Sequence, residues 1–145
     1  MKKERLAIAS DHAGYEKKEY VKKYLEDKGY ELKDLGALSP ERSDYPDFGH
    51  VLASAVERGE FSKGISLCGS GNGINITANK HQGIRAALCW NEEIAGLARS
   101  HNDANICSIP ARFITNEEAE KIVDAFLNTD FEGGRHERRI KKIPL

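Results

Sequence analysis

The sequence predicts an α/β protein with a three-layer, Rossmann-like fold around a five-stranded parallel sheet. Short apolar runs alternate with amphipathic segments along the chain, which is typical of repeated βαβ units. The length of 145 residues matches one domain that buries a core without disulfides or a metal. We therefore expect a single domain over residues 1–145, with residues 130–145 as a basic C-terminal tail.

The short apolar runs and the amphipathic segments predict the strands and the helices of this fold, respectively. The short apolar runs predict strands at Arg5–Ser10, Tyr30–Leu35, Gly64–Cys68, Ile84–Cys89 and Asn105–Ile109. The amphipathic segments between them predict helices at Tyr15–Lys28, Pro46–Arg58, Asn72–Lys80, Asn91–His101 and Asn116–Asn128. The second helix has its apolar residues at helical spacing from Phe48 to Val56. The fifth begins with a capping box, Thr115 to Glu118.

The C-terminal tail differs in character, because basic residues follow the pair Gly133–Gly134. A short helix is predicted there. Arg135 and Arg139 are four residues apart, so both guanidinium groups would lie on one helix face and could bind a phosphate. A solvated basic helix is the alternative.

Composition excludes several classes of partner and site. A net charge of −1 gives no overall attraction to nucleic acid or membrane. Neither a membrane-spanning run nor a signal-peptide core is present, so we expect a cytoplasmic protein. The three cysteines and five histidines show neither Cys-x-x-Cys nor His-x-x-x-His spacing. We therefore expect no disulfide and no metal site.

The segment Leu67–Gly73 places a thiol at the end of a strand and follows it with alternating glycines. Backbone N–H groups can converge in such a loop and hold a phosphate or an oxyanion. The alternative is a tight turn after an inert, buried Cys68. Ile74 and Asn75 break the dinucleotide and Walker patterns, so NAD and ATP are not supported and no cofactor is expected.

Ligands of open parallel sheets bind beyond the carboxyl ends of the strands. Asp11 and His12 follow the first strand and Cys68 ends the third, so these groups should share one edge, although Asp11 could simply cap the first helix. His101 lies at the wrong end of its helix to join them within one subunit, unless that helix is short or His101 comes from a neighbouring subunit, which would place the site between subunits. N–H dipoles near the thiol would favour the thiolate and make it a candidate base. These residue types suit proton transfer on a phosphorylated carbonyl compound.

Seven segments closely resemble the type B ribose-5-phosphate isomerases, a family that includes galactose-6-phosphate isomerase subunits. The resemblance covers essentially the whole chain in the family's order. The segments are Asp11–Gly14, Ser43–Pro46, Cys68–Gly73, Ala78–Lys80, Gly83–Ala86, Ser100–Asn105 and Glu132–His136.

The resemblance implies a cofactor-free isomerase that interconverts ribose 5-phosphate and ribulose 5-phosphate through an enediolate in the pentose phosphate pathway. It implies a homodimer or a dimer of dimers with the active site between two subunits. Cys68 is then the base that moves a proton between C1 and C2, with the Ser70 hydroxyl assisting, and His101 opens the furanose ring. Some relatives have a glutamate where this chain has Ile74, which cannot transfer protons, so the role of base falls to Cys68. Many relatives have threonine at Ser70, and serine keeps the hydroxyl.

The substrate-binding residues implied by the resemblance come from both ends of the chain. They are Asp11, His12, Gly69, Ser70, Gly71, Asn72, Gly73, Asn102, Arg112, Arg135 and Arg139. Asp11 would contact the ring oxygen or hydroxyls, the loop N–H groups the enediolate, and Asn102 and Arg112 the sugar. His12, Arg135 and Arg139 would bind the phosphate, and Tyr45 would line the pocket.

Three alternatives stay open at this point. The substrate could have six carbons, as in allose 6-phosphate. An acyl hydrolase built on Ser70, His101 and Asp103 is disfavoured, because the Gly-x-Ser-x-Gly motif is absent. A non-enzymatic sugar-phosphate binding module would need Arg135 and Arg139, but not Cys68 or His101.

Overall fold

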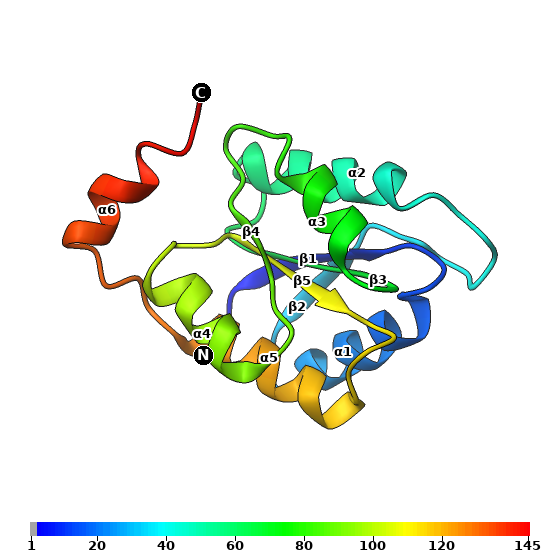
Figure 1. Cartoon of the computed structure of the whole chain (residues 1–145). Coiled ribbons are helices and arrows are strands. Elements are labelled where there is room, and N and C mark those ends of the chain that lie inside the picture. Colours follow the sequence, from blue (N-terminus) through cyan, green and yellow to red (C-terminus); the bar gives the residue numbers. More distant parts are fainter. Residues whose placement is uncertain (1–2) are drawn as a thin grey trace.

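The computed structural model describes residues 3–145 and has a parallel sheet between two layers of helices (Figure 1). The strands lie in the order β2-β1-β3-β5-β4, and every neighbouring pair is parallel. The α/β fold class with a five-stranded parallel sheet is therefore confirmed. The strands are β1 (Arg5–Ser10), β2 (Glu31–Asp34), β3 (Gly64–Cys68), β4 (Ala86–Leu88) and β5 (Ile106–Pro110).

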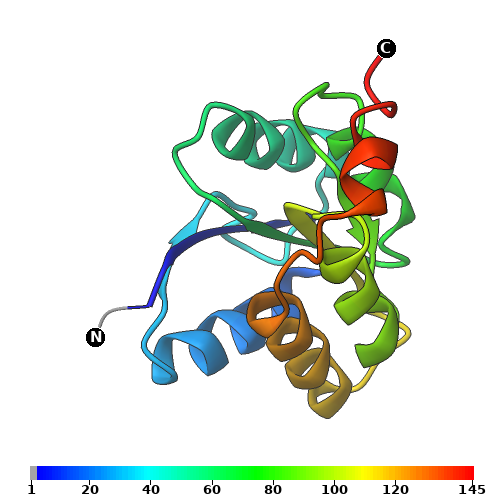
Figure 2. The same ribbon diagram turned by 90° about the vertical axis from the view of Figure 1, so that its left-hand side faces the viewer.

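Helices cover both faces of this sheet. The helices are α1 (Tyr15–Asp27), α2 (Tyr45–Glu57), α3 (Asn72–Ala78), α4 (Glu92–Ser100), α5 (Asn116–Asn128) and α6 (Arg135–Ile140). Figure 2 shows α2 and α3 on one face and α1 and α5 on the other, with α4 packed beside α5. The short helix expected after the glycine pair is α6, which lies outside both layers (Figure 1).

Successive side chains of a strand point to opposite faces of the sheet, so alternate residues pack into two separate hydrophobic cores. Leu6 and Ile8 of β1 pack in the core under α1, α4 and α5, which also contains Phe126. Ala7 and Ala9 face the opposite way, into the smaller core under α2. Both faces of the sheet are covered, and this explains why β1, β3 and β5 read as nearly continuous apolar runs.

Asparagine side chains account for several small shifts from the predicted boundaries. Helix α3 ends at Ala78, because the Asn79 amide binds both the N–H and the C=O of Ala86, at 2.8 and 2.9 Å. Strand β4 starts at Ala86, after Arg85 has donated its N–H to Asn105 Oδ1 at 2.8 Å. Asn91 is the cap of α4 and accepts from Ile94 N at 2.8 Å.

None of the helices within residues 3–145 has both the length and the apolar character that crossing a membrane requires.

Candidate active site

The carboxyl ends of β1, β3 and β5 meet at one edge of the sheet. Ser10 pairs with Leu67, and Cys68 pairs with Pro110. The chain after β5 continues along the chain after β3, since Arg112 N–H donates to Gly69 C=O at 3.0 Å. We call this region the Cys68 edge, and it comprises Asp11, His12, Cys68–Gly73 and Arg112.

Cys68 is the last residue of β3 and only 5% exposed. Its carbonyl accepts a hydrogen bond from Ala111 N at 3.0 Å, so the backbone that carries the thiol is part of the sheet. Burial of this kind suits a base that is shielded from bulk water, and it also suits an inert packed thiol. The kinetics of Cys68→Ala separate the two interpretations.

The glycine loop is a strand-to-helix turn in which side chains would not fit. Gly71 has a φ of +78°, and a Cβ there would lie 2.6 Å from Leu88 Cδ1. A Cβ on Gly73 would lie 2.6 Å from the Tyr45 ring, so Tyr45 lies directly against the loop. Ser70 is exposed, and its Oγ accepts from Asn72 N at 3.3 Å.

Asp11 and His12 are held by their own chain. Asp11 is buried, and its Oδ1 accepts from Gly14 N at 3.1 Å, so this oxygen closes the turn before α1. Asp11 is therefore not the cap of α1, which is Gly14 and has no side-chain cap hydrogen bond. His12 N–H donates to Ser43 Oγ at 3.1 Å, and its Nδ1 lies 3.1 Å from Ser43 N. When Nδ1 accepts from that N–H, the ring proton sits on Nε2, free to donate to an anion.

Arg112 completes the Cys68 edge from the β5 side. A Cβ built on Gly69 would lie 3.3 Å from Arg112 Nη1, so the guanidinium lies over the glycine loop. Arg112 also borders a cavity of about 460 Å³, together with Ala13, Glu16, Lys17, Tyr20, Ala111 and Asn116. The Cys68 edge thus joins a thiol, a carboxylate, an imidazole and a guanidinium.

The remaining residues expected in the site lie at the opposite edge, beyond the amino ends of the strands. His101 caps the C-terminus of α4, and Asn105, just before β5, accepts from Gly64 N at the start of β3 at 2.9 Å. Helix α6 joins them, because Glu132 N–H donates to Ser100 C=O at 3.0 Å. Figure 1 shows α6 at the end of the molecule away from the tips of β3 and β5. We call His101, Asn102, Arg135 and Arg139 the His101 edge.

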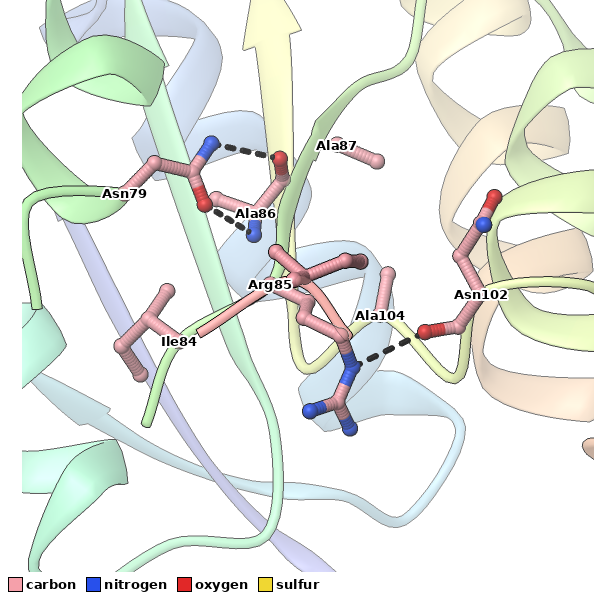
Figure 3. Close-up of a pocket in the computed structure, with 8 residues that line it drawn as sticks. Asn79, Ile84, Arg85, Ala86, Ala87, Asn102 and Ala104 are labelled. Atoms are coloured by element: carbon pink, nitrogen blue, oxygen red, sulfur yellow. Dashed lines mark hydrogen bonds between the residues drawn. The ribbon is translucent and has the colours of Figure 1, made fainter. Parts of the chain in front are cut away.

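Two arginines that the sequence analysis did not single out shape the turn after His101. Asp103 has a φ of +46°, and Arg99 Nη1 donates to its Oδ1 at 2.8 Å. Arg85 donates to the backbone of the same turn. Its Nε donates to Asn102 C=O at 2.9 Å (Figure 3), and its Nη2 donates to Asp103 C=O, also at 2.9 Å. Asn102 borders a cavity of about 320 Å³ there. The only sequence signal for Arg85 was its place in a segment that resembled the isomerase family.

Ser70, His101 and Asp103, the residues of the hydrolase alternative, do not form a catalytic triad within one chain. The Asp103 carboxylate binds Arg99 at 2.8 Å, whereas a triad acid would orient the histidine. His101 stacks instead on His136, with ring centroids 4.3 Å apart and 14° between the ring planes. Ser70 belongs to the opposite edge of the sheet.

His101, Glu132 and His136 offer ligand atoms within 4.8 Å of one another. A tetrahedral zinc site requires donors that converge on one point at about 2.0–2.1 Å. The His101 and His136 rings are stacked on one another, with 14° between their planes, and the absence of a metal site stays a prediction. Burial and the neighbouring Arg135 lower the pKa of His136, which keeps the ring neutral.

Comparisons with known proteins find relatives over nearly the whole chain. A family model described as Ribose/Galactose Isomerase matches residues 6–143. Ribose-5-phosphate isomerase B of Escherichia coli is 42% identical over 96% of this chain and 93% of its own length.

Solved structures of similar proteins have the same fold. A ribose 5-phosphate isomerase of Thermotoga maritima superposes with a TM-score of 0.96 and 53% identity, over 97% of each chain. Ribose-5-phosphate isomerase B of Mycoplasma genitalium, solved with bound ribulose-5-phosphate, has a TM-score of 0.94 and 42% identity, over 99% of this chain and 95% of that one.

Proposed function

Because the chain belongs to the ribose/galactose isomerase family, we propose that it interconverts ribose 5-phosphate and ribulose 5-phosphate without a cofactor. The chain is a sugar-phosphate isomerase of pentose phosphate metabolism, as the sequence resemblance predicted. The observation that carries this assignment is the full-length match to a relative solved with bound ribulose-5-phosphate. The cytoplasmic location stays a prediction.

The Cys68 edge supports the proton transfer itself. The Cys68 thiolate removes the proton from C2 of the open-chain aldose, the C–H electron pair forms the C1=C2 bond, and negative charge moves onto O1. Donors preorganised around that oxygen would lower the barrier, and N–H groups of residues 69–73 with the Ser70 hydroxyl are suited to this. Transfer of the O2 proton to O1 and return of the first proton to C1 give the ketose.

The His101 edge supports ring opening and phosphate binding. His101 takes the proton of the anomeric hydroxyl and delivers it to the ring oxygen as the C1–O4 bond breaks, with Asp11 and Asn102 orienting the sugar. Arg135 and Arg139 are exposed and make no ion pair within residues 3–145, so their donors are available to a phosphate. His12 would meet the same phosphate from the Cys68 edge.

A complete site needs both edges. In one chain the Cys68 edge lies at the carboxyl ends of the strands and the His101 edge lies beyond their amino ends. A symmetric dimer solves this problem, because a two-fold axis that brings the Cys68 edge of one copy to the His101 edge of another creates two equal sites. We therefore propose a homodimer, or a dimer of dimers, with a shared site built from residues 1–145 of each copy.

Subunit mixing tests the shared site. Cys68→Ala and His101→Asn should each be nearly inactive on ribose 5-phosphate. Co-refolding them at equal amounts should restore about a quarter of wild-type activity, because half of the dimers are mixed and each has one intact site.

The matched control mixes wild type with the double variant Cys68→Ala/His101→Asn, whose mixed dimers have no intact site. Activity per wild-type chain should fall to about half, since half of the wild-type chains enter such dimers. If subunit exchange is verified and the mixture of Cys68→Ala with His101→Asn still recovers no activity, the shared site is contradicted. The same assay with allose 6-phosphate measures whether six-carbon substrates are accepted.

A further inference from the structure

His136 has no role in the proposed reaction, yet it is the residue in face-to-face contact with the histidine that opens the sugar ring. The two ring centroids lie 4.3 Å apart, and the planes differ by 14°. His136 is 6% exposed, whereas His101 is half-buried and open to a ligand. The buried ring therefore forms a floor under the accessible one.

Backbone contacts fix this stack in place. Glu132 N–H donates to Ser100 C=O at 3.0 Å, one residue before His101. Arg99 Nε donates to Thr129 C=O at 3.3 Å. The segment that leads into α6 is thus attached twice to the last turn of α4, and the His136–His101 contact follows from those attachments.

Hydrogen bonding does not explain a histidine at position 136. Its Nε2 is buried without a hydrogen-bond partner within residues 3–145, and Glu132 Oε1 is 3.7 Å away, beyond hydrogen-bond distance. The His101 ring likewise makes no hydrogen bond to the described chain. The contact that His136 does make is the stack of its flat face on the His101 ring.

The surroundings of His136 favour its neutral form. Burial lowers the pKa of His136, and Arg135, His101 and Arg139 lower it further, while Glu132 raises it. A neutral His136 lets His101 take up a proton during ring opening without a second positive charge against its face.

We propose that His136 is a positioning residue that fixes the ring plane of His101 for opening of the cyclic sugar. The inference rests on the proposed function, because only a substrate that closes a ring needs this step. Misplacement of a catalytic group by about 1 Å can cost about 10²-fold in rate, so the loss of a flat partner should be measurable.

Two variants and two substrates test the proposal. His136→Leu is apolar but not planar, and His136→Phe keeps a flat ring without a titratable nitrogen. Ribose 5-phosphate closes a furanose, whereas erythrose 4-phosphate has its O4 phosphorylated and cannot. His136→Leu should lower kcat/KM for ribose 5-phosphate roughly tenfold or more but change it about twofold or less for erythrose 4-phosphate. His136→Phe should retain ribose 5-phosphate activity to within about threefold.

Each result decides the matter. Equal losses of kcat/KM on both substrates in His136→Leu would mean that His136 only supports α6. A loss in His136→Phe as large as in His136→Leu would mean that the flatness of the ring is not what matters. Either result overturns the proposal. If the Leu variant does not fold, His136→Gln replaces it with the same expected ratio. Wild-type protein inactive on both substrates would remove the proposed function as well, whereas active wild type with an unchanged ratio removes this inference alone.

Discussion

The Cys68 edge and the His101 edge differ in how far one chain completes them. At the Cys68 edge, Asp11 and His12 are hydrogen-bonded to their own chain, and Cys68 is held in a strand that is buried along its whole length. At the His101 edge, Arg135 and Arg139 project from a peripheral helix and are exposed. Groups that the chain has already satisfied are fixed in place, while groups that it leaves unpaired are available to another molecule.

This difference separates two kinds of contribution to the reaction. The Cys68 edge holds its backbone rigidly, as transition-state stabilisation requires. We expect the exposed arginines of the His101 edge to supply positive charge for substrate binding. Variants at the first edge should therefore act mainly on kcat, and arginine variants at the second mainly on KM.

Cys68→Ala should have the largest effect. The change removes the proposed base and leaves the loop and the arginines, so kcat should fall by about 10²–10⁴ while inhibition by inorganic phosphate changes little. Cys107→Ala, which removes a buried thiol within the sheet, is the matched control and should keep wild-type kcat. In D₂O, the wild-type enzyme should place some deuterium at C1 of ribulose 5-phosphate. Wild-type kcat in Cys68→Ala would make the thiol a packed strand-end residue and end its assignment as base.

His101→Asn should have the next largest effect, and only on cyclic substrate. Loss of the acid/base group should lower kcat/KM for ribose 5-phosphate by about 10²-fold, because general acid–base catalysis contributes at least this much. Activity on erythrose 4-phosphate should be retained far better. His50→Asn, at an exposed histidine on α2, serves as the control. Parallel losses on the two substrates would take His101 out of ring opening.

Arg139→Ala should act on binding. One charge-assisted contact of roughly 1.5–3 kcal/mol is removed, so KM should rise and inhibition by inorganic phosphate should weaken, with kcat less affected. Arg138→Ala is a close control, since Arg138 is also exposed on α6 but points about 100° away around the helix. Equal KM values for both variants and wild type would return α6 to the solvated-helix interpretation.

Removal of metal ions by chelation should leave the isomerase activity unchanged. The proton transfers proposed for Cys68 and His101 need no metal. Activity should therefore survive exhaustive chelation and dialysis in an isomerisation assay. Loss of turnover that zinc restores would contradict the mechanism at both edges.

The sequence determined the fold class and most of the helices and strands. Hydrophobic periodicity and helix capping are local properties of the chain, and the periodicity decides which face of an element is buried. The capping box at Thr115 and the apolar runs of the buried strands are examples. It also placed Cys68 and the glycine loop together, since they are neighbours in the chain. Asn79, Asn91 and Asn105 moved element ends by a residue or two, because side-chain hydrogen bonds to backbone compete with helix and strand pairing.

Only the tertiary structure decided which distant side chains meet. Lys18 sits on an exposed-looking charged stretch of α1, yet its side chain is fully buried and its Nζ lies 2.6 Å from Asp34 Oδ2. The Arg85 and Arg99 contacts around Asp103 and the stack of His136 on His101 also join separate segments. Local propensity contains no information about such contacts, because those of Lys18, Arg85 and His136 join residues that are far apart in the chain and meet only when the elements pack together.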